Sequence, residues 1–347
     1  MEKRRLGRSD LHVGVLGVGC WQFGGGSYWG AQDQRDVDRV VHKALDAGAN
    51  YFDTAEVYND GESERSLGEA LRGRRSEAII GSKISPHHLY PSVLQEHCDN
   101  TLRRLQTDYL DLYMLHWPIS AHSIAHFTTS EEAKTHPPSI AEGFAALADL
   151  QREGKIRAIG ISNHGTRQMQ EVADTGVEVA ANEMAYNLLS RAVEDRILPH
   201  CVDQGIGFIG YMPLQQGLLG GKTIESIRPM QARSRHFHHS RGAGARHGED
   251  GAEAEIRIAL RQLNEMAAEL GVRLSELALA WVIAGRGVST TIVGCRNTEQ
   301  LEANIRSAAL KLTSDTVARL NAITQPVWDK LGNNPDYYEN RENSRIR

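Results

Sequence analysis

The sequence predicts a single (β/α)8 barrel, an α/β fold in which one domain covers residues 1–347 and long loops lie at the carboxyl ends of the strands. Three observations support this prediction. The chain has 347 residues, which suits one large α/β barrel. Eight short apolar runs alternate with longer amphipathic segments, and no linker interrupts the alternation. An open, doubly wound sheet is the alternative.

The eight apolar runs are typical of parallel strands that are covered on both faces. Each run is too short for a helix, and several are rich in β-branched residues. In chain order we expect strands at 13–19, 50–53, 78–82, 109–115, 156–161, 179–183, 207–211 and 290–293.

The segments between the strands have the apolar spacing of amphipathic helices. In the first of them, Val37, Val40, Val41 and Ala44 share one side, and Gly48 is a typical stop signal. We expect helices at 36–47, 64–71, 92–105, 140–152, 166–174, 194–204, 253–270 and 298–307. Three remaining stretches, 116–139, 214–251 and 326–347, are expected to form loops around a site at the barrel mouth.

Composition excludes several classes of protein. The formal net charge is −5, from 39 basic and 44 acidic residues, so no net positive charge favours nucleic acid. No apolar run is long enough to span a membrane, and the first residues do not lead into a signal peptide. The four cysteines are widely spaced and fit a reduced, cytoplasmic chain better than a disulfide scaffold.

Three consecutive predicted strands end in polar residues that could carry chemistry. Asp53 ends the second strand, Lys83 follows the third and His116 follows the fourth, while Tyr58 lies five residues beyond Asp53. Each residue alone also fits an ordinary core or surface position. Together they indicate a site, because a buried lysine and a buried acid are costly unless they are paired.

The segment FDTAEVY at 52–58 and the segment GESERSLGEAL at 61–71 resemble the aldo-keto reductase superfamily, and the resemblance extends over nearly the full length. It implies an NAD(P)-dependent oxidoreductase that reduces an aldehyde or ketone, or oxidises a sugar or polyol. By the same resemblance Tyr58 donates the proton, Lys83 lowers the pKa of Tyr58, Asp53 pairs with Lys83, and His116 polarises the carbonyl group.

Elementary chemistry supports these roles. Carbonyl reduction needs a hydride at carbon and a proton at oxygen, and free tyrosine, with a pKa of about 10, is a weak acid at neutral pH. We therefore expect the Lys83 ammonium to lower the pKa of Tyr58, and the Asp53 carboxylate to keep Lys83 charged despite burial.

The resemblance also implies a site for NADP(H) or, alternatively, NAD(H). It assigns cofactor contacts to Gly19, Trp21, Asp53, Ser162, Asn163, Asn182, Tyr211, Gly294, Arg296, Gln300 and Asn304. Arg296 could hold a 2′-phosphate, which favours NADP(H). The run GIGFIG at 205–210 matches a dinucleotide-binding pattern, but it lies within a predicted strand and is discounted.

Trp21, Tyr28 and Trp117, with Tyr58 and His116, are expected to line the substrate pocket. The alternative function is a cofactor-binding regulatory subunit with little turnover. No metal-site motif is found, and we interpret the His-rich loop 233–241 as a clasp over the cofactor. The sequence leaves the substrate, the direction of the reaction and the oligomeric state open.

Overall fold

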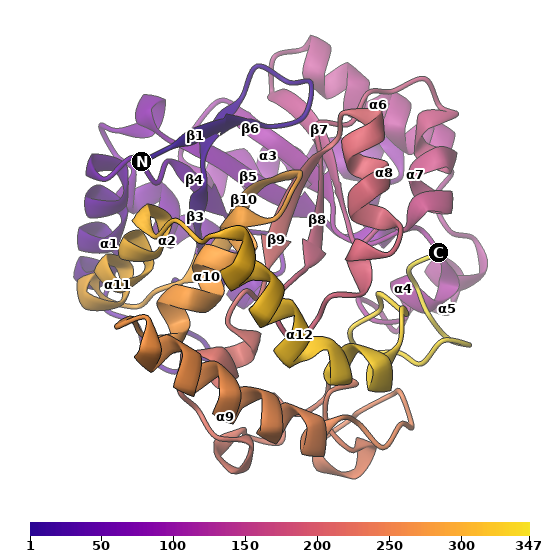
Figure 1. Ribbon diagram of the computed structural model, residues 1–347. Helices are drawn as coiled ribbons and strands as arrows, with labels where there is room; N and C mark the ends of the chain where they lie inside the picture. The colour runs from indigo at the N-terminus through magenta and orange to yellow at the C-terminus, as the bar shows by residue number, and fades with distance from the viewer.

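The computed structural model describes residues 1–347 and contains a closed barrel of eight parallel strands (Figure 1). The strands are β3 (Leu16–Gly19), β4 (Tyr51–Asp53), β5 (Ile79–Ile84), β6 (Leu110–Leu115), β7 (Ile156–Ser162), β8 (Ala181–Ala185), β9 (Gly207–Tyr211) and β10 (Val288–Gly294). The barrel closes where β10 pairs with β3. The predicted barrel is therefore confirmed, and the open sheet is excluded.

An antiparallel hairpin precedes the barrel and closes its amino-terminal end. It consists of β1 (Lys3–Arg5) and β2 (His12–Gly14), so the first predicted strand divides into β2 and β3. Leu6 and Leu11 of the hairpin pack in one buried cluster with Tyr51 from the barrel interior. Gly7 has φ +57°, and a Cβ there would meet the carbonyl oxygen of Ala180 at 2.3 Å, so this turn requires glycine.

Helices cover the outside of the barrel. They are α1 (Gln34–Asp46), α2 (Glu62–Ala70), α3 (Pro91–Leu105), α6 (Ile140–Arg152), α7 (Thr166–Ala173), α8 (Ile197–Gln204), α10 (Leu274–Ala284) and α11 (Thr298–Ala309). Two further long helices, α9 (Glu253–Glu269) and α12 (Ser314–Leu331), pack against one another in front of the barrel (Figure 1).

Short elements lie in the connections. They are α4 (Ala121–Ile124), α5 (Glu131–Thr135) and the 3₁₀ turns η1 (Tyr58–Gly61), η2 (Arg75–Glu77), η3 (Pro86–His88), η4 (Ala192–Glu194), η5 (Gln215–Gly220), η6 (Ile224–Ser226) and η7 (His239–Arg241). The expected loop 116–139 contains α4 and α5, and the expected loop 214–251 contains η5, η6 and η7.

The sequence analysis missed α10 and α12. Eight of the eleven residues of α10 are buried, so this helix lacks the alternation of apolar and polar sides that marks an amphipathic helix. In α12, Pro326 lies inside the helix, whereas we expected this proline to begin a terminal loop.

The carboxyl-terminal segment 332–347 returns to the mouth of the barrel, close to α4 and α5 (Figure 1). The Arg345 guanidinium lies 3.7 Å from the centre of the Trp117 ring and is paired with Asp336. The backbone oxygen of Arg347 accepts the N–H groups of Arg167 and Gln168 at the start of α7. These contacts attach the segment to the loops that follow β6 and β7.

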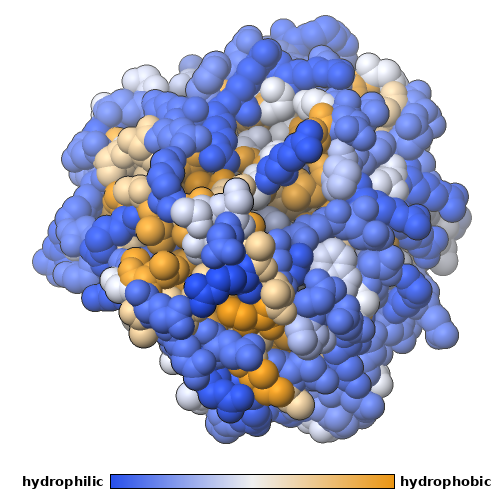
Figure 2. Space-filling model, viewed as in Figure 1, coloured by the Kyte–Doolittle hydropathy of each residue, from blue (hydrophilic) through white to orange (hydrophobic).

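The face of the molecule seen in Figure 2 is predominantly hydrophilic, and its apolar side chains gather toward the middle. None of the helices combines the length and the apolar character needed to cross a bilayer.

Candidate active site

Three adjacent strands bring the predicted polar residues to one end of the barrel. Lys83, near the end of β5, contacts the carboxylate of Asp53 at the end of β4. The Lys83 Nζ also donates to the Thr54 carbonyl oxygen at 3.0 Å and lies 3.4 Å from the Tyr58 hydroxyl. The rings of Tyr58 and His116 meet edge to face, with their centres 5.8 Å apart. The four residues that the sequence singled out thus form one cluster.

Lys83 is charged although its side chain is fully buried. Burial lowers the pKa of Lys83, but the Asp53 carboxylate opposes this effect and holds the pKa above its ordinary value. The site therefore contains a fixed ammonium group beside the Tyr58 hydroxyl.

The expected direction of the Tyr58 pKa shift is corrected by the structure. Lys83 lowers the pKa of Tyr58, as predicted, but burial is the larger effect and Asp53 adds to it, so the pKa lies above its ordinary value. The sequence does not show how deeply Tyr58 is buried, so it could not weigh the cost of burying the phenolate against the charge of Lys83. In the free protein the phenol keeps its proton, which is the state that a proton donor requires.

Glu183 is part of the cluster and was missed. One of its carboxyl oxygens, Oε1, lies 3.4 Å from the Lys83 Nζ, and the other is buried without a hydrogen-bond partner. Burial and the neighbouring Asp53 raise the pKa of Glu183 well above its usual range. One carboxylate already balances Lys83, so the second carboxyl group keeps its proton.

Asn182, which we expected to bind the cofactor, points away from Lys83. Its amide donates to the carbonyl oxygen of His164 and contacts the sulfur of Met169 on α7. Side chains alternate along a strand, so Asn182 faces the helices while Glu183 faces the barrel interior. Alternation means that only one of these two neighbours can face inward, but it does not say which one.

His116 is uncharged at neutral pH. Burial and the nearby Lys83 lower the pKa of His116 well below its usual range, and its Nδ1 is buried without a hydrogen-bond partner. A neutral imidazole can donate one hydrogen bond to a substrate oxygen without adding a charge.

Aromatic side chains lie beside the ring of Tyr58. The ring of Trp21 stacks on that of Tyr28 at 5.0 Å and lies 5.8 Å from that of Tyr58. Trp29, which the sequence analysis did not select, meets Trp21 edge to face. Trp117 is 6% exposed, and the Arg345 guanidinium lies over its ring.

A second group of predicted residues lies at the ends of β7 and β9. The Tyr211 hydroxyl donates to the side-chain oxygen of Asn163 at 2.7 Å, and the Asn163 amide donates to the Ser162 hydroxyl and to the His116 carbonyl oxygen. Asn163 has φ +62°, a strained backbone conformation that fixes its amide at the barrel mouth. Hydrogen bonds therefore link Tyr211, Asn163 and Ser162, which we expect to contact the nicotinamide, to the backbone of His116.

The third predicted group lies where β10 leads into α11. The Arg296 guanidinium donates to the Gln32 side chain at 2.8 Å and to the carbonyl oxygens of Trp29 and Ala31. The Gln300 side chain accepts the Arg296 backbone N–H, and Asn304 is buried farther along α11. Gly19 pairs with Gly294 across the β3–β10 junction beside this group.

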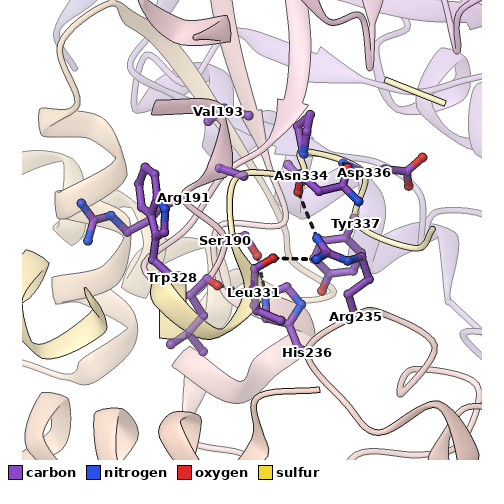
Figure 3. A pocket seen from close by; sticks show the side chains of 15 residues that line it. Ser190, Arg191, Val193, Arg235, His236, Trp328, Leu331, Asn334, Asp336 and Tyr337 are labelled. Carbon is purple, nitrogen blue, oxygen red and sulfur yellow. Dashed lines mark hydrogen bonds between the residues drawn. The ribbon is translucent and has the colours of Figure 1, made fainter. Parts of the chain in front are cut away.

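The His-rich loop is anchored at its centre. Arg235 donates to the carbonyl oxygens of Leu331 and Asn334, and the ring of His236 bonds to Ser190; Figure 3 shows these residues around a small cavity. This cavity contains none of the four clustered residues, so it is separate from the reacting groups. These contacts hold the centre of the loop against Ser190, which precedes η4, and against the end of α12.

Comparisons with known proteins agree with this geometry. A sequence model described as the aldo/keto reductase family matches residues 15–325. An NADH-specific methylglyoxal reductase of Escherichia coli (strain K12) is 32% identical over 342 residues, which cover 92% of this chain and 97% of that protein. The aldo-keto reductase YhdN of Bacillus subtilis (strain 168) is 30% identical and covers 96% of both chains. A crystal structure of an aldo/keto reductase from Klebsiella pneumoniae with NADP and acetate is 28% identical, with a TM-score of 0.71 over 94% of this chain and 96% of that one.

Proposed function

The chain belongs to the aldo/keto reductase family, and we propose from this premise that it is an NAD(P)H-dependent carbonyl reductase in which Tyr58 donates the proton. The observation that carries the proposal is the contact of the buried Lys83 ammonium with both Asp53 and the Tyr58 hydroxyl, beside the neutral His116. The substrate class is an aldehyde or ketone, or in the reverse direction a sugar or polyol hydroxyl.

The groups at the barrel mouth fit a nicotinamide nucleotide. Tyr211 offers an aromatic ring, Asn163 and Ser162 offer an amide and a hydroxyl, and all three lie next to His116. At the start of α11 the Asn297 side chain accepts the Gln300 N–H, and the neighbouring Gly294 is exposed, so an anion could approach this helix N-terminus. Relatives use both forms of cofactor, since the Escherichia coli enzyme is named NADH-specific and the Klebsiella pneumoniae structure contains NADP. We propose NADP(H) for this chain, with NAD(H) as the alternative.

When bound, the nicotinamide supplies a hydride to the carbonyl carbon. Tyr58 gives its hydroxyl proton to the carbonyl oxygen, so the C=O group becomes a CH–OH group. Lys83 stabilises the tyrosinate that remains, and Asp53 keeps Lys83 charged throughout. His116 donates a hydrogen bond to the same oxygen and so stabilises the developing negative charge.

The raised pKa of Tyr58 is compatible with this step. The acceptor is an alkoxide, which is a stronger base than a tyrosinate, so the proton moves toward the substrate oxygen once hydride transfer has begun. The buried ammonium then favours the product state, because it pairs with the new negative charge on Tyr58.

Steady-state assays test the proposal. Purified protein is assayed with NADPH and NADH against a panel of aldehydes and ketones that includes methylglyoxal, and with NADP⁺ and NAD⁺ against sugars and polyols. We expect turnover of at least one carbonyl substrate. Tight cofactor binding without turnover in either direction would contradict the proposal and support a regulatory subunit instead.

A further inference from the structure

Three side chains from different parts of the chain converge behind the loop that carries Tyr58. Glu56 lies on this loop, His88 ends η3 after β5, and His97 lies on α3. The two carboxylate oxygens of Glu56 lie 2.9 Å from the Nδ1 of His88 and 2.6 Å from the Nδ1 of His97. One donor atom from each residue falls within 4.8 Å of the other two.

This donor set has the chemistry of a transition-metal site. Two imidazoles and one carboxylate are ligands that Zn²⁺ and similar ions prefer, and three protein ligands leave a fourth position for water. The Glu56 side chain is only 5% exposed, whereas the His88 and His97 side chains are 24% and 28% exposed. An ion can therefore enter from the solvent side and meet the carboxylate at the inner side.

The surroundings of the cluster support a ligand. The Ser85 backbone N–H donates to Glu56 at 2.9 Å and orients the carboxylate, as outer groups do around metal ligands. The Ser85 hydroxyl is buried without a partner, and so is the Nδ1 of His87, whose ring centre lies 3.8 Å from that of His88. The protein's own hydrogen bonds thus leave polar atoms beside the cluster unsatisfied.

We propose that Glu56, His88 and His97 bind one divalent transition-metal ion of the Zn²⁺ class. An ion there joins the loop of Tyr58, the connection after β5 and helix α3, so it stabilises the protein and holds the loop in place. The sequence analysis found no metal motif because the three ligands are separated by 32 and 9 residues.

A second cluster provides a matched control. His238, His239 and Asp250 also place their donor atoms within 4.8 Å of one another. The side chains of His238 and Asp250 are 40% and 83% exposed, so they must lose more conformational freedom on binding. We expect this cluster to bind an ion more weakly.

Cobalt binding to the full chain tests the proposal. Protein without an affinity tag is treated with EDTA, dialysed and titrated with Co²⁺, whose visible absorption reports imidazole and carboxylate ligation. The variants are His88→Asn, His97→Asn and His239→Asn. Asparagine can still donate a hydrogen bond to Glu56, so the fold is retained, but its amide is a poor ligand for this class of ion.

We expect one Co²⁺ per wild-type chain, and about tenfold or greater weakening in His88→Asn and in His97→Asn but not in His239→Asn. Zn²⁺ should raise the Tm of the wild type, and EDTA should reverse the shift. Absence of binding to the wild type, equal binding by His97→Asn, or loss only in His239→Asn would each overturn the proposal. A Tm shift that is unchanged in His88→Asn would also overturn it.

Discussion

Lys83 is the residue at which the charges of the site meet. Its ammonium faces Asp53, Glu183 and the Tyr58 hydroxyl within a fully buried environment. The sequence could predict Asp53, Lys83 and His116, because each ends an apolar strand and strand ends form barrel sites. It did not identify Glu183, because choosing between Asn182 and Glu183 requires knowing which face of β8 points inward.

Glu183 should make the protein less stable as the pH rises. Its pKa in the folded state is raised above the ordinary value of 4.5, so the folded state holds a proton that the unfolded chain releases. The protonated Glu183 therefore stabilises the folded state at low pH, and this stabilisation is lost as the pH rises above about 4.5. Glu183→Gln should remove this loss of folding free energy, which at pH 7 amounts to at most about 3 kcal/mol.

Urea unfolding of Glu183→Gln and wild type between pH 5 and pH 8 measures this difference. The variant should be the more stable protein, and the gap should widen with pH. The exposed Glu269→Gln serves as the control and should change stability little at any pH. A variant that is less stable than the wild type, by an amount independent of pH, would show that Glu183 is ionised in the folded protein.

At the scale of elements, amphipathic spacing predicted the helices that have one apolar side. Helix α6, expected at 140–152, has these bounds, and α3 begins one residue earlier than expected. Helix α10 was not predicted, because burial on most sides removes the pattern that identifies a surface helix. The loop between β3 and α1 meets Arg296, just before α11, and no pattern in either segment predicts this contact.

Arg296 connects that loop to the start of α11 and is the proposed contact for a 2′-phosphate. In this structure its guanidinium donates to Gln32, Trp29 and Ala31, so a phosphate would compete with these acceptors. Arg296→Leu should raise the Kd for NADPH about 10- to 100-fold, as expected for loss of a charge-assisted hydrogen bond. The Kd for NADH should change little.

Fluorescence titration of both cofactors against wild type and Arg296→Leu makes this comparison. Gln32→Leu is the control, because it loosens the same loop without removing the positive charge. An equal loss of affinity for NADPH and NADH in Arg296→Leu would mean that Arg296 acts only by holding the loop.

At the scale of the whole molecule, the carboxyl-terminal segment depends on one buried ion pair. Arg345 and Asp336 have fully buried side chains and are 2.8 Å apart, and Arg345 also covers Trp117. This pair could not be predicted from the sequence, because it lies in a segment without a periodic pattern. Trp117, which we predict to line the substrate pocket, lies under Arg345.

We expect the pair of Arg345 and Asp336 to stabilise the protein less in acid. Burial raises the pKa of Asp336, but the hydrogen bonds and charge of Arg345 outweigh burial and lower it. The stabilisation is therefore present above about pH 4 and is lost as the pH falls further. Asp336→Asn leaves Arg345 buried without its partner and should cost about 3–5 kcal/mol at pH 7.

Urea unfolding from pH 7 to pH 3 checks this prediction. The wild type and Asp336→Asn should differ most at pH 7, and the difference should shrink as the pH falls from about 4 toward 3, because the unfolded wild-type chain then takes up a proton that the folded carboxylate resists. A difference that stays constant over this range would mean that the pair does not stabilise the folded chain through its charge.

The most direct test of the proposed function is the rate of hydride transfer in Tyr58→Phe, measured by rapid mixing of the NADPH-loaded protein with a carbonyl substrate found in the assay panel. Tyr90→Phe, at the residue before α3 and outside the predicted pocket, is the control. We predict that NADPH binds Tyr58→Phe as it binds the wild type, while the rate falls about 10²- to 10⁴-fold and Tyr90→Phe stays near the wild-type rate. A Tyr58→Phe rate near that of the wild type would contradict the assignment of Tyr58 as the proton donor.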